Sequence, residues 1–160
     1  MITLNPQPAV EIEQFRCEPF CLQQTFVTPL QDLPRFVSTL ISLFDPGTGF
    51  LSIDQVVFEP KNLLVLAMRN EIIIGDQWHL NLTASGKKDI GELLEAASGD
   101  WVDFLFVPIP QTFAIYADHD EYTTFFVKEE DTLNLLTSKL CEAGFQIVGE
   151  YRRPTVGNWT

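Results

Sequence analysis

Hydrophobic residues recur at steps of three and four over three stretches of the chain, which is the spacing of an amphipathic helix. The first stretch begins at Thr28-Pro29, where Thr can cap a helix and Pro can fill its first position, and ends at Asp45-Pro46-Gly47. The second runs from Ser85 to Gly99, and the third from Glu129 to Ala143. The pattern therefore predicts three helices, each with one apolar face against a core.

Short segments rich in β-branched and aromatic residues lie before, between and after these helices and predict strands. Several of the connections between them are only a few residues long, which favours antiparallel neighbours over helical crossovers. The expected strands are Val10–Phe15, Gln23–Val27, Gln55–Phe58, Leu63–Met68, Glu71–Ile74, Trp78–Leu82, Val102–Val107, Thr112–Tyr116, Tyr122–Val127 and Gln146–Tyr151. This order predicts the α+β class, with a mostly antiparallel sheet and about three helices packed on one of its faces.

The length and composition fit one domain that folds without metal or disulfide staples. The chain has 160 residues, of which 46% are hydrophobic and 20% charged, enough apolar material to argue against disorder. We expect a single domain over residues 1–160, with a flexible N-terminal tail at residues 1–8 and a C-terminal tail at residues 152–160. The start of the chain has no signal-peptide pattern, and no apolar run reaches the length of a membrane span, so we expect a cytoplasmic protein.

The charge balance limits the kinds of partner. The 22 acidic residues against 10 basic ones give a formal net charge of −12, which argues against nucleic-acid binding and against anionic membrane surfaces. Acids are densest between Asp100 and Asp131, where eight of them accompany a single base, Lys128. The last three of these acids suit the positive end of the third helix dipole. The acids around Trp101 and those at residues 118–121 remain without a structural reason.

The run Asp118-His119-Asp120-Glu121 is the one cluster of acid–base or ligand-type side chains. A functional interpretation pairs His119 with a carboxylate as a general base, or joins several of these groups around a divalent cation. Contiguous residues alternate faces on a strand and splay apart in a tight loop, so the spacing favours a solvated hairpin turn. No metal or other cofactor is expected.

The three cysteines match no known functional spacing. Cys17 and Cys21 form neither a redox nor a zinc pair, and Cys141 falls within the third predicted helix. We expect all three to be reduced thiols that contribute to packing.

These features predict a small acidic cytoplasmic protein-binding module, such as an inhibitor or immunity-type protein that neutralises a basic partner. Carboxylates complementary to a cationic cleft speed association, and an aromatic side chain supplies an anchor. One alternative is a hydrolase or metal-dependent enzyme that uses the run at residues 118–121. Another is a structural or assembly protein whose acidity serves solubility alone. The expected partner contacts are Asp100, Trp101, Asp103, Asp118, Asp120 and Glu121. Their two loops form one surface only if they meet at the same edge of the sheet.

Overall fold

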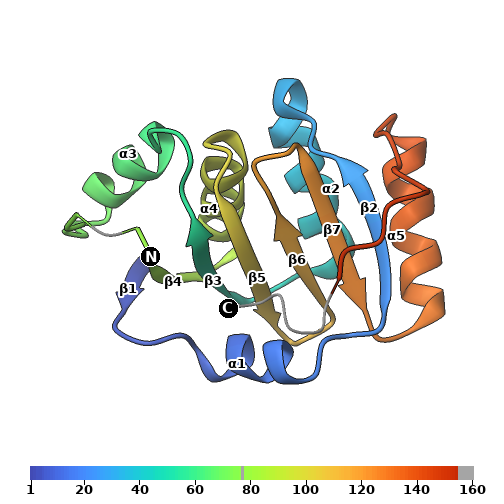
Figure 1. Ribbon diagram of the computed structural model, residues 1–160, viewed down its shortest axis with the longest axis horizontal. Helices are drawn as coiled ribbons and strands as arrows, with labels where there is room; N and C mark the ends of the chain where they lie inside the picture. Colours follow the sequence, from blue (N-terminus) through green and yellow to red (C-terminus); the bar gives the residue numbers. More distant parts are fainter. Residues whose placement is uncertain (77, 155–160) are drawn as a thin grey trace.

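The computed structural model, which describes residues 1–76 and 78–154, contains a seven-stranded antiparallel sheet in the order β1-β4-β3-β5-β6-β7-β2 (Figure 1). The strands are β1 (Ile2–Asn5), β2 (Leu22–Val27), β3 (Thr48–Gln55), β4 (Asn81–Ser85), β5 (Asp103–Ile109), β6 (Phe113–Ala117) and β7 (Tyr122–Val127). The helices are α1 (Val10–Cys17), α2 (Leu33–Phe44), α3 (Lys61–Arg69), α4 (Lys87–Gly99) and α5 (Glu130–Glu142), with a 3-10 turn η1 (Leu30–Asp32) before α2. The predicted α+β class is confirmed. None of the described helices is both long and apolar enough to cross a membrane.

The expected number of helices is wrong, because two segments predicted as strands are helical. Residues 10–15 lie in α1, and residues 63–68 lie in α3. Both segments are short, and a short apolar run cannot be assigned to helix or strand from its periodicity alone. In α3, Leu63, Leu66 and Ala67 are buried, and Val65 and Met68 are exposed, which is helical spacing. The structure therefore has five helices among its described residues where three were expected.

Two strands were not anticipated. Residues 2–5, expected in a flexible tail, form β1 and pair with β4 from Ile2↔Ala84 to Asn5↔Asn81. Residues 48–55, which follow the predicted helix end, form β3 between β4 and β5. The expected strands at residues 55–58 and 71–74 are absent, and the closing strand at 146–151 is reduced to one bridge, Phe26↔Ile147. In the expected C-terminal tail, Arg153 is buried, whereas residues 155–160 lie outside the described part.

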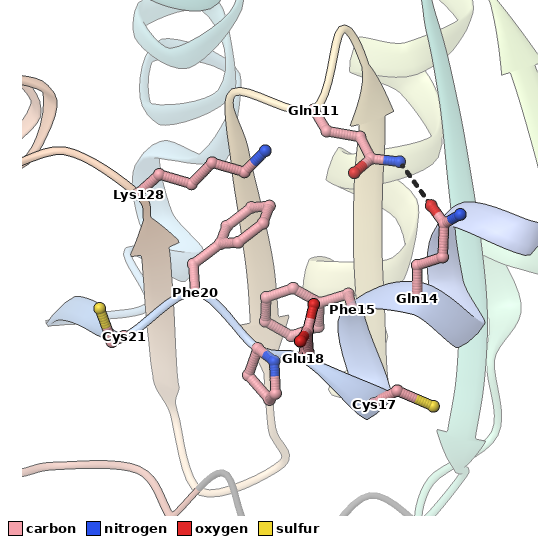
Figure 2. Close-up of a pocket in the computed structure, with 9 residues that line it drawn as sticks. Gln14, Phe15, Cys17, Glu18, Phe20, Cys21, Gln111 and Lys128 are labelled. Carbon is pink, nitrogen blue, oxygen red and sulfur yellow. Dashed lines mark hydrogen bonds between the residues drawn. The ribbon is translucent and has the colours of Figure 1, made fainter.

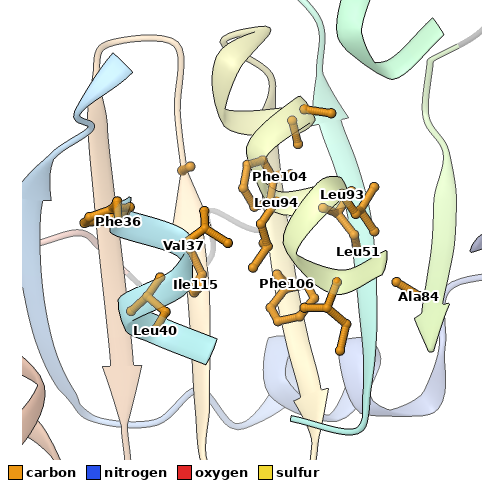
Figure 3. Close-up of a cluster of buried hydrophobic side chains, with 14 of the residues drawn as sticks. Phe36, Val37, Leu40, Leu51, Ala84, Leu93, Leu94, Phe104, Phe106 and Ile115 are labelled. Carbon is orange, nitrogen blue, oxygen red and sulfur yellow. The ribbon is translucent and has the colours of Figure 1, made fainter. Parts of the chain in front are cut away.

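The main core lies between the sheet and the helices α2, α3, α4 and α5 (Figure 3). There, α2 packs Phe36, Val37 and Leu40 towards β6 and β7, while α4 packs Leu93 and Leu94 towards β3 and β5. The expectation of helices on one face therefore holds for these four.

Helix α1 lies on the opposite face of the sheet. Its buried residues Ile12 and Phe15 form a second, smaller cluster with Leu105, Val107, Ala114 and Phe126. Those four strand residues alternate with residues of the main core, as expected for a strand buried on both sides. Helix α1 is found at one end of the sheet in Figure 1, so it covers only part of this face. The remainder carries polar side chains.

Candidate functional site

The part of the sheet beyond α1 has a polar surface. Strand alternation places Ser52 and Asp54 of β3, Tyr116 of β6 and Thr124 of β7 on the same side as α1. Side chains from α1, from the β6–β7 turn and from the C-terminal segment join them. We refer to the whole set as the polar face: Arg16, Ser52, Asp54, Asp103, Tyr116, Asp118, His119, Thr124 and Arg153.

At one side of the polar face, Arg16 and Tyr116 share a carboxylate. The Arg16 guanidinium donates from Nη2 to Asp54 Oδ1 at 2.8 Å and to Ser52 Oγ at 3.2 Å. The Tyr116 hydroxyl donates to Asp54 Oδ2 at 3.0 Å. Burial, and then the charge of Asp54, raise the pKa of Tyr116, so the phenol stays protonated and acts as a donor.

At the other side, Arg153 of the C-terminal segment is held against the sheet. Its Nη2 donates to Asp118 Oδ2 at 2.8 Å and its Nε donates to Thr124 Oγ1 at 3.0 Å. The guanidinium carbon lies 4.7 Å from the centre of the Tyr116 ring and 5.5 Å from that of Tyr151. The side chains of Arg153 and Asp118 are only 10% and 12% exposed. This ion pair is therefore largely removed from water.

The main chain of the same segment is also fixed. The Arg153 N–H donates to Gln23 Oε1 at 2.7 Å, and its carbonyl accepts from Gln23 Nε2 at 3.0 Å. In Figure 1 the C-terminal segment passes over β2 towards β7. Residues 151–154 thus form a strap across the polar face. The side-chain amide of Gln23 binds its main chain, and the Arg153 guanidinium binds the sheet.

The two predicted loops meet through Asp103 and His119. Asp103 Oδ1 accepts hydrogen bonds from the His119 backbone N–H at 2.7 Å and from its Nδ1 at 2.9 Å. The hydrogen bond to Asp103 raises the pKa of His119; burial opposes this rise, and the charges of Asp103, Asp120 and Asp118 add to it. The imidazole Nε2 lies 3.7 Å from Asp120 Oδ1. The loops at residues 100–103 and 118–121 therefore lie at the same edge of the sheet, the one formed by the ends of strands β5, β6 and β7 and not by an edge strand.

The predicted hairpin turn at residues 118–121 is confirmed, and Asp118 shapes it. Asp118 Oδ1 accepts from the backbone N–H groups of Asp120 at 2.9 Å and Tyr122 at 3.2 Å. Glu121 has a left-handed φ of 71°, which is uncommon outside glycine. The turn leaves Glu121 and Asp120 exposed, with 78% of the Asp120 side chain accessible. Within the described residues, no group of three or more histidines, cysteines or acids is placed to hold a metal ion.

Asp100 has a structural role that the sequence did not indicate. Its carboxylate accepts from the backbone N–H groups of Asn62 at 3.1 Å and Leu63 at 2.8 Å, in the first turn of α3. Burial raises the pKa of Asp100, and the two backbone hydrogen bonds act against this. The residue is only 6% exposed. In this conformation it is not available as the partner contact that was expected.

Trp101 stands at the surface next to this cap. It has a left-handed φ of 58°, is half-buried, and packs edge-on against Phe58 with the ring centres 6.1 Å apart. Phe58 and Val57, in the loop after β3, are exposed. The residue chosen as an aromatic anchor is therefore part of an aromatic pair.

A separate groove of about 850 Å³ lies beside the C-terminal end of α1 and the segment that follows it (Figure 2). Cys17 and Cys21 line it and point away from each other, and both are exposed, as is Cys141, so the expectation of packed thiols is wrong. Three of its polar side chains have partners: Gln111 Nε2 donates to Gln14 Oε1 at 3.3 Å, and the Lys128 ammonium lies 4.9 Å from the centre of the Phe20 ring. We therefore take the polar face and its adjoining loops as the candidate site.

The structure brings four of the six predicted contact residues together: Asp103 and Asp118 hold the turn, and Asp120 and Glu121 project from it. Trp101 lies in the same loop as Asp103 but packs on Phe58, and Asp100 points away to α3. The sequence reasoning missed the residues that the strap and β3 supply, Arg153 and Asp54. The alternation of Ser52 and Asp54 with Leu51 and Ile53 was a signal for Asp54, and no local pattern indicated Arg153. Comparison of the chain with protein-family models, curated proteins and solved structures finds no match.

Proposed function

We propose that the chain is a protein-binding module that presents an acidic edge of its sheet to a basic partner. One observation carries the proposal: the hydrogen bonds between Asp103 and His119 hold two loops, 16 residues apart in sequence, at the same edge. Had the loops lain at opposite ends of the sheet, their charge would have had no common surface to act on.

The surface in question consists of five side chains, which we call the acidic edge: Val57, Phe58, Trp101, Asp120 and Glu121. The loop that carries Val57 and Phe58 leaves β3 at Gln55, which pairs with Asp103, so it starts beside the joined loops. The acidic edge therefore combines an aromatic pair with exposed carboxylates. At protein interfaces, aromatic side chains often contribute most of the binding energy, and charged residues lie around them at the rim.

The negative charge continues behind Trp101. A groove of about 600 Å³ between α3 and α4 has Trp101 in its wall together with Glu95 and with Glu92, whose carboxylate accepts from Arg69 Nη2 at 3.1 Å. Burial, and then the charge of Glu92, raise the pKa of Glu95, which marks it as a carboxylate short of positive partners. A basic protein that docks on the acidic edge would supply such charge.

Charge of this sign and density acts on association more than on final affinity. Carboxylates facing a cationic surface steer the encounter and raise the association rate, and they disfavour acidic competitors. An inhibitor or immunity-type protein, which must reach a basic target quickly, is the form of this function that we favour.

The test is a comparison of two charge reversals of equal size. Asp120→Lys/Glu121→Lys changes the acidic edge, whereas Glu13→Lys/Glu18→Lys changes two exposed acids on and after α1, at the other end of the sheet. Neither pair replaces Asp118, which holds Arg153, and the backbone N–H of residue 120 that donates to Asp118 is kept. Each protein is used as bait, and the basic proteins that it retains are identified and quantified by mass spectrometry.

We expect the wild type and the Glu13/Glu18 variant to retain the same basic proteins, and the Asp120/Glu121 variant to lose them. Retention should also fall steeply as salt is raised, because exposed charge pairs are screened. Equal retention by both variants would remove the proposal. Association of the chain only with itself would instead favour the structural or assembly alternative.

Hydrolysis with His119 as general base is the second candidate. It is favoured by the bond from Nδ1 to Asp103, which orients the imidazole and leaves Nε2 facing the exposed Asp120. Hydrolysis of 4-nitrophenyl acetate by the wild type and by His119→Gln provides the test. Equal rates would remove this candidate.

A further inference from the structure

We propose that the polar face is an arginine-binding site, which the chain's own Arg153 fills and from which an arginine of a protein partner can displace it. The site itself does not depend on the function proposed above. The exchange with a partner does rest on it.

The walls of the site are held in place by groups other than Arg153. Asp118 Oδ1 is engaged by two backbone N–H groups of its own turn, which turns Oδ2 towards the guanidinium. Thr124 is fully buried, and its hydroxyl forms a hydrogen bond with the hydroxyl of Thr25, with 2.8 Å between the two Oγ1 atoms. The Tyr116 ring is fixed through its hydroxyl by Asp54. The acceptors and the ring are therefore arranged by the sheet before any guanidinium arrives, which lowers the cost of binding one.

The geometry selects a guanidinium over an ammonium. Two different nitrogens of Arg153, Nε and Nη2, donate to two different acceptors, and the planar group lies near the ring of Tyr116 in the sheet and that of Tyr151 in the strap itself. A lysine ammonium is a compact point charge that lacks the flat, forked donor array these acceptors and rings require.

The charge of the polar face also favours a cation in this position. Without the guanidinium of Arg153, the cationic or ionisable nitrogen groups that pair with Asp54, Asp103 and Asp118 in the described residues are Arg16 and the imidazole of His119. A buried carboxylate that has lost its partner is costly, so Asp118 requires a replacement cation.

The strap that delivers Arg153 is attached to the sheet by hydrogen bonds of Arg152 and Arg153 and by the ring contact of Tyr151 with Tyr122. Residues 151–154 contain no regular secondary structure, and the neighbours Arg152 and Pro154 are exposed. Arg152 donates one hydrogen bond, to the Cys21 carbonyl at 3.1 Å. A short segment outside the sheet ladder, with exposed residues on both sides of Arg153, can open locally without unfolding the rest. Asp118 belongs to the same turn as Asp120 and Glu121, so a partner on the acidic edge would have the site within reach.

The first experiment tests the site without any partner. In Arg153→Ala, methylguanidinium at millimolar concentration should raise the melting temperature, whereas methylammonium at the same ionic strength should not. The double variant Arg153→Ala/Asp118→Asn and the matched variant Arg152→Ala should show no rise specific to methylguanidinium. If Arg153→Ala does not fold, the readout becomes recovery of the folded protein in methylguanidinium relative to methylammonium. Equal responses to the two cations, or an equal response with Asp118→Asn, would overturn the site.

The second experiment tests the exchange in the wild type. Acetyl-Gly-Arg-Gly-amide should shift the Arg153 Nε–H signal in a nitrogen–proton NMR spectrum, whereas acetyl-Gly-Lys-Gly-amide at the same concentration should leave it unchanged. An unchanged signal with both peptides would overturn the exchange, even if methylguanidinium rescues Arg153→Ala. Neither result depends on Asp120 or Glu121, so loss of the proposed function would be recognised separately by the charge-reversal variants.

Discussion

Asp103 Oδ1 accepts two hydrogen bonds from the same residue, His119: one from its backbone N–H at 2.7 Å and one from Nδ1 at 2.9 Å. Asp103 is buried at the start of β5, whereas His119 lies in the turn between β6 and β7. A single carboxylate thus fixes both the main chain and the ring of a residue on another loop. Protonation of the imidazole strengthens one of these two bonds, whereas the backbone bond does not titrate.

The first prediction is a loss of stability as the pH rises through the neutral range. The pKa of His119 is raised above 6.5, first by its hydrogen bond to Asp103, so the folded protein binds this proton more tightly than the unfolded chain does. The stabilisation is fully present below the ordinary pKa and is lost as the pH passes through the raised one. Urea unfolding of the wild type from about pH 6 to about pH 8 should show this decline.

The variants assign this decline to one residue. His119→Gln should remove the part of the decline that comes from the imidazole, and His79→Gln, at the other histidine and exposed, should retain it. A decline that persists in His119→Gln would mean that another group titrates.

The elements that could be predicted from the sequence are those whose stabilising contacts follow a regular period. The helices at residues 87–99 and 130–142 have apolar residues at helical spacing, and β7 was predicted with its observed bounds. In contrast, α3 depends on a distant residue, because its first turn donates to Asp100, 37 residues from Leu63. No local pattern contains that information, and the apolar run at residues 63–68 was therefore assigned to a strand.

The candidate site shows the same division. The turn at residues 118–121 could be predicted because Asp is typical of turn positions. Its joining to Asp103, its ion pair with Arg153 and the bond between Tyr116 and Asp54 all link residues that are distant in sequence. A single sequence contains the members of such pairs but does not show which residues pair. The density of acidic residues could therefore be read from the sequence, but the hydrogen bonds and ion pairs that engage some of them could not.

The second prediction concerns Gly49, in the strand that the sequence reasoning missed. A Cβ at this position would lie 2.3 Å from two carbon atoms of the Phe106 ring, and Phe106 is fully buried. Glycine in a strand interior often marks such a close approach. Gly49→Ala should destabilise the protein by about 1–3 kcal/mol, measured by urea unfolding.

The matched control is Gly47→Ala, because the nearest atom to its Cβ would be the Ile109 carbonyl oxygen at 4.0 Å. The double variant Gly49→Ala/Phe106→Leu should recover part of the loss. Wild-type stability in Gly49→Ala would show that the ring moves aside at no cost.

The third prediction is a gain in stability from Glu95→Gln at neutral pH. Burial, and then the charge of Glu92, raise the pKa of Glu95, so the folded state binds a proton more readily than the unfolded chain. For an acid this means that stability falls as the pH rises from 4.5 to the raised pKa, and at neutral pH the full loss is present.

Removal of the charge should recover this loss, by less than about 1 kcal/mol at a surface position. The gain should vanish in acid, where Glu95 is protonated. Glu142→Gln, at an exposed acid of α5, should give no comparable gain. Thermal unfolding at neutral and acid pH measures both variants, and a gain from Glu95→Gln that is independent of pH would contradict the electrostatic origin.

The fourth prediction separates folding from binding at Asp100. Asp100→Ala removes the acceptor of two backbone N–H groups at the start of α3 and should cost about 1–2 kcal/mol of stability in urea unfolding. Asp100→Asn retains one acceptor oxygen and should cost less. Because the carboxylate is 6% exposed, retention of basic proteins by the folded variants should equal that of the wild type. Lost retention at unchanged stability would instead place Asp100 among the partner contacts, and α3 would then have to open on binding.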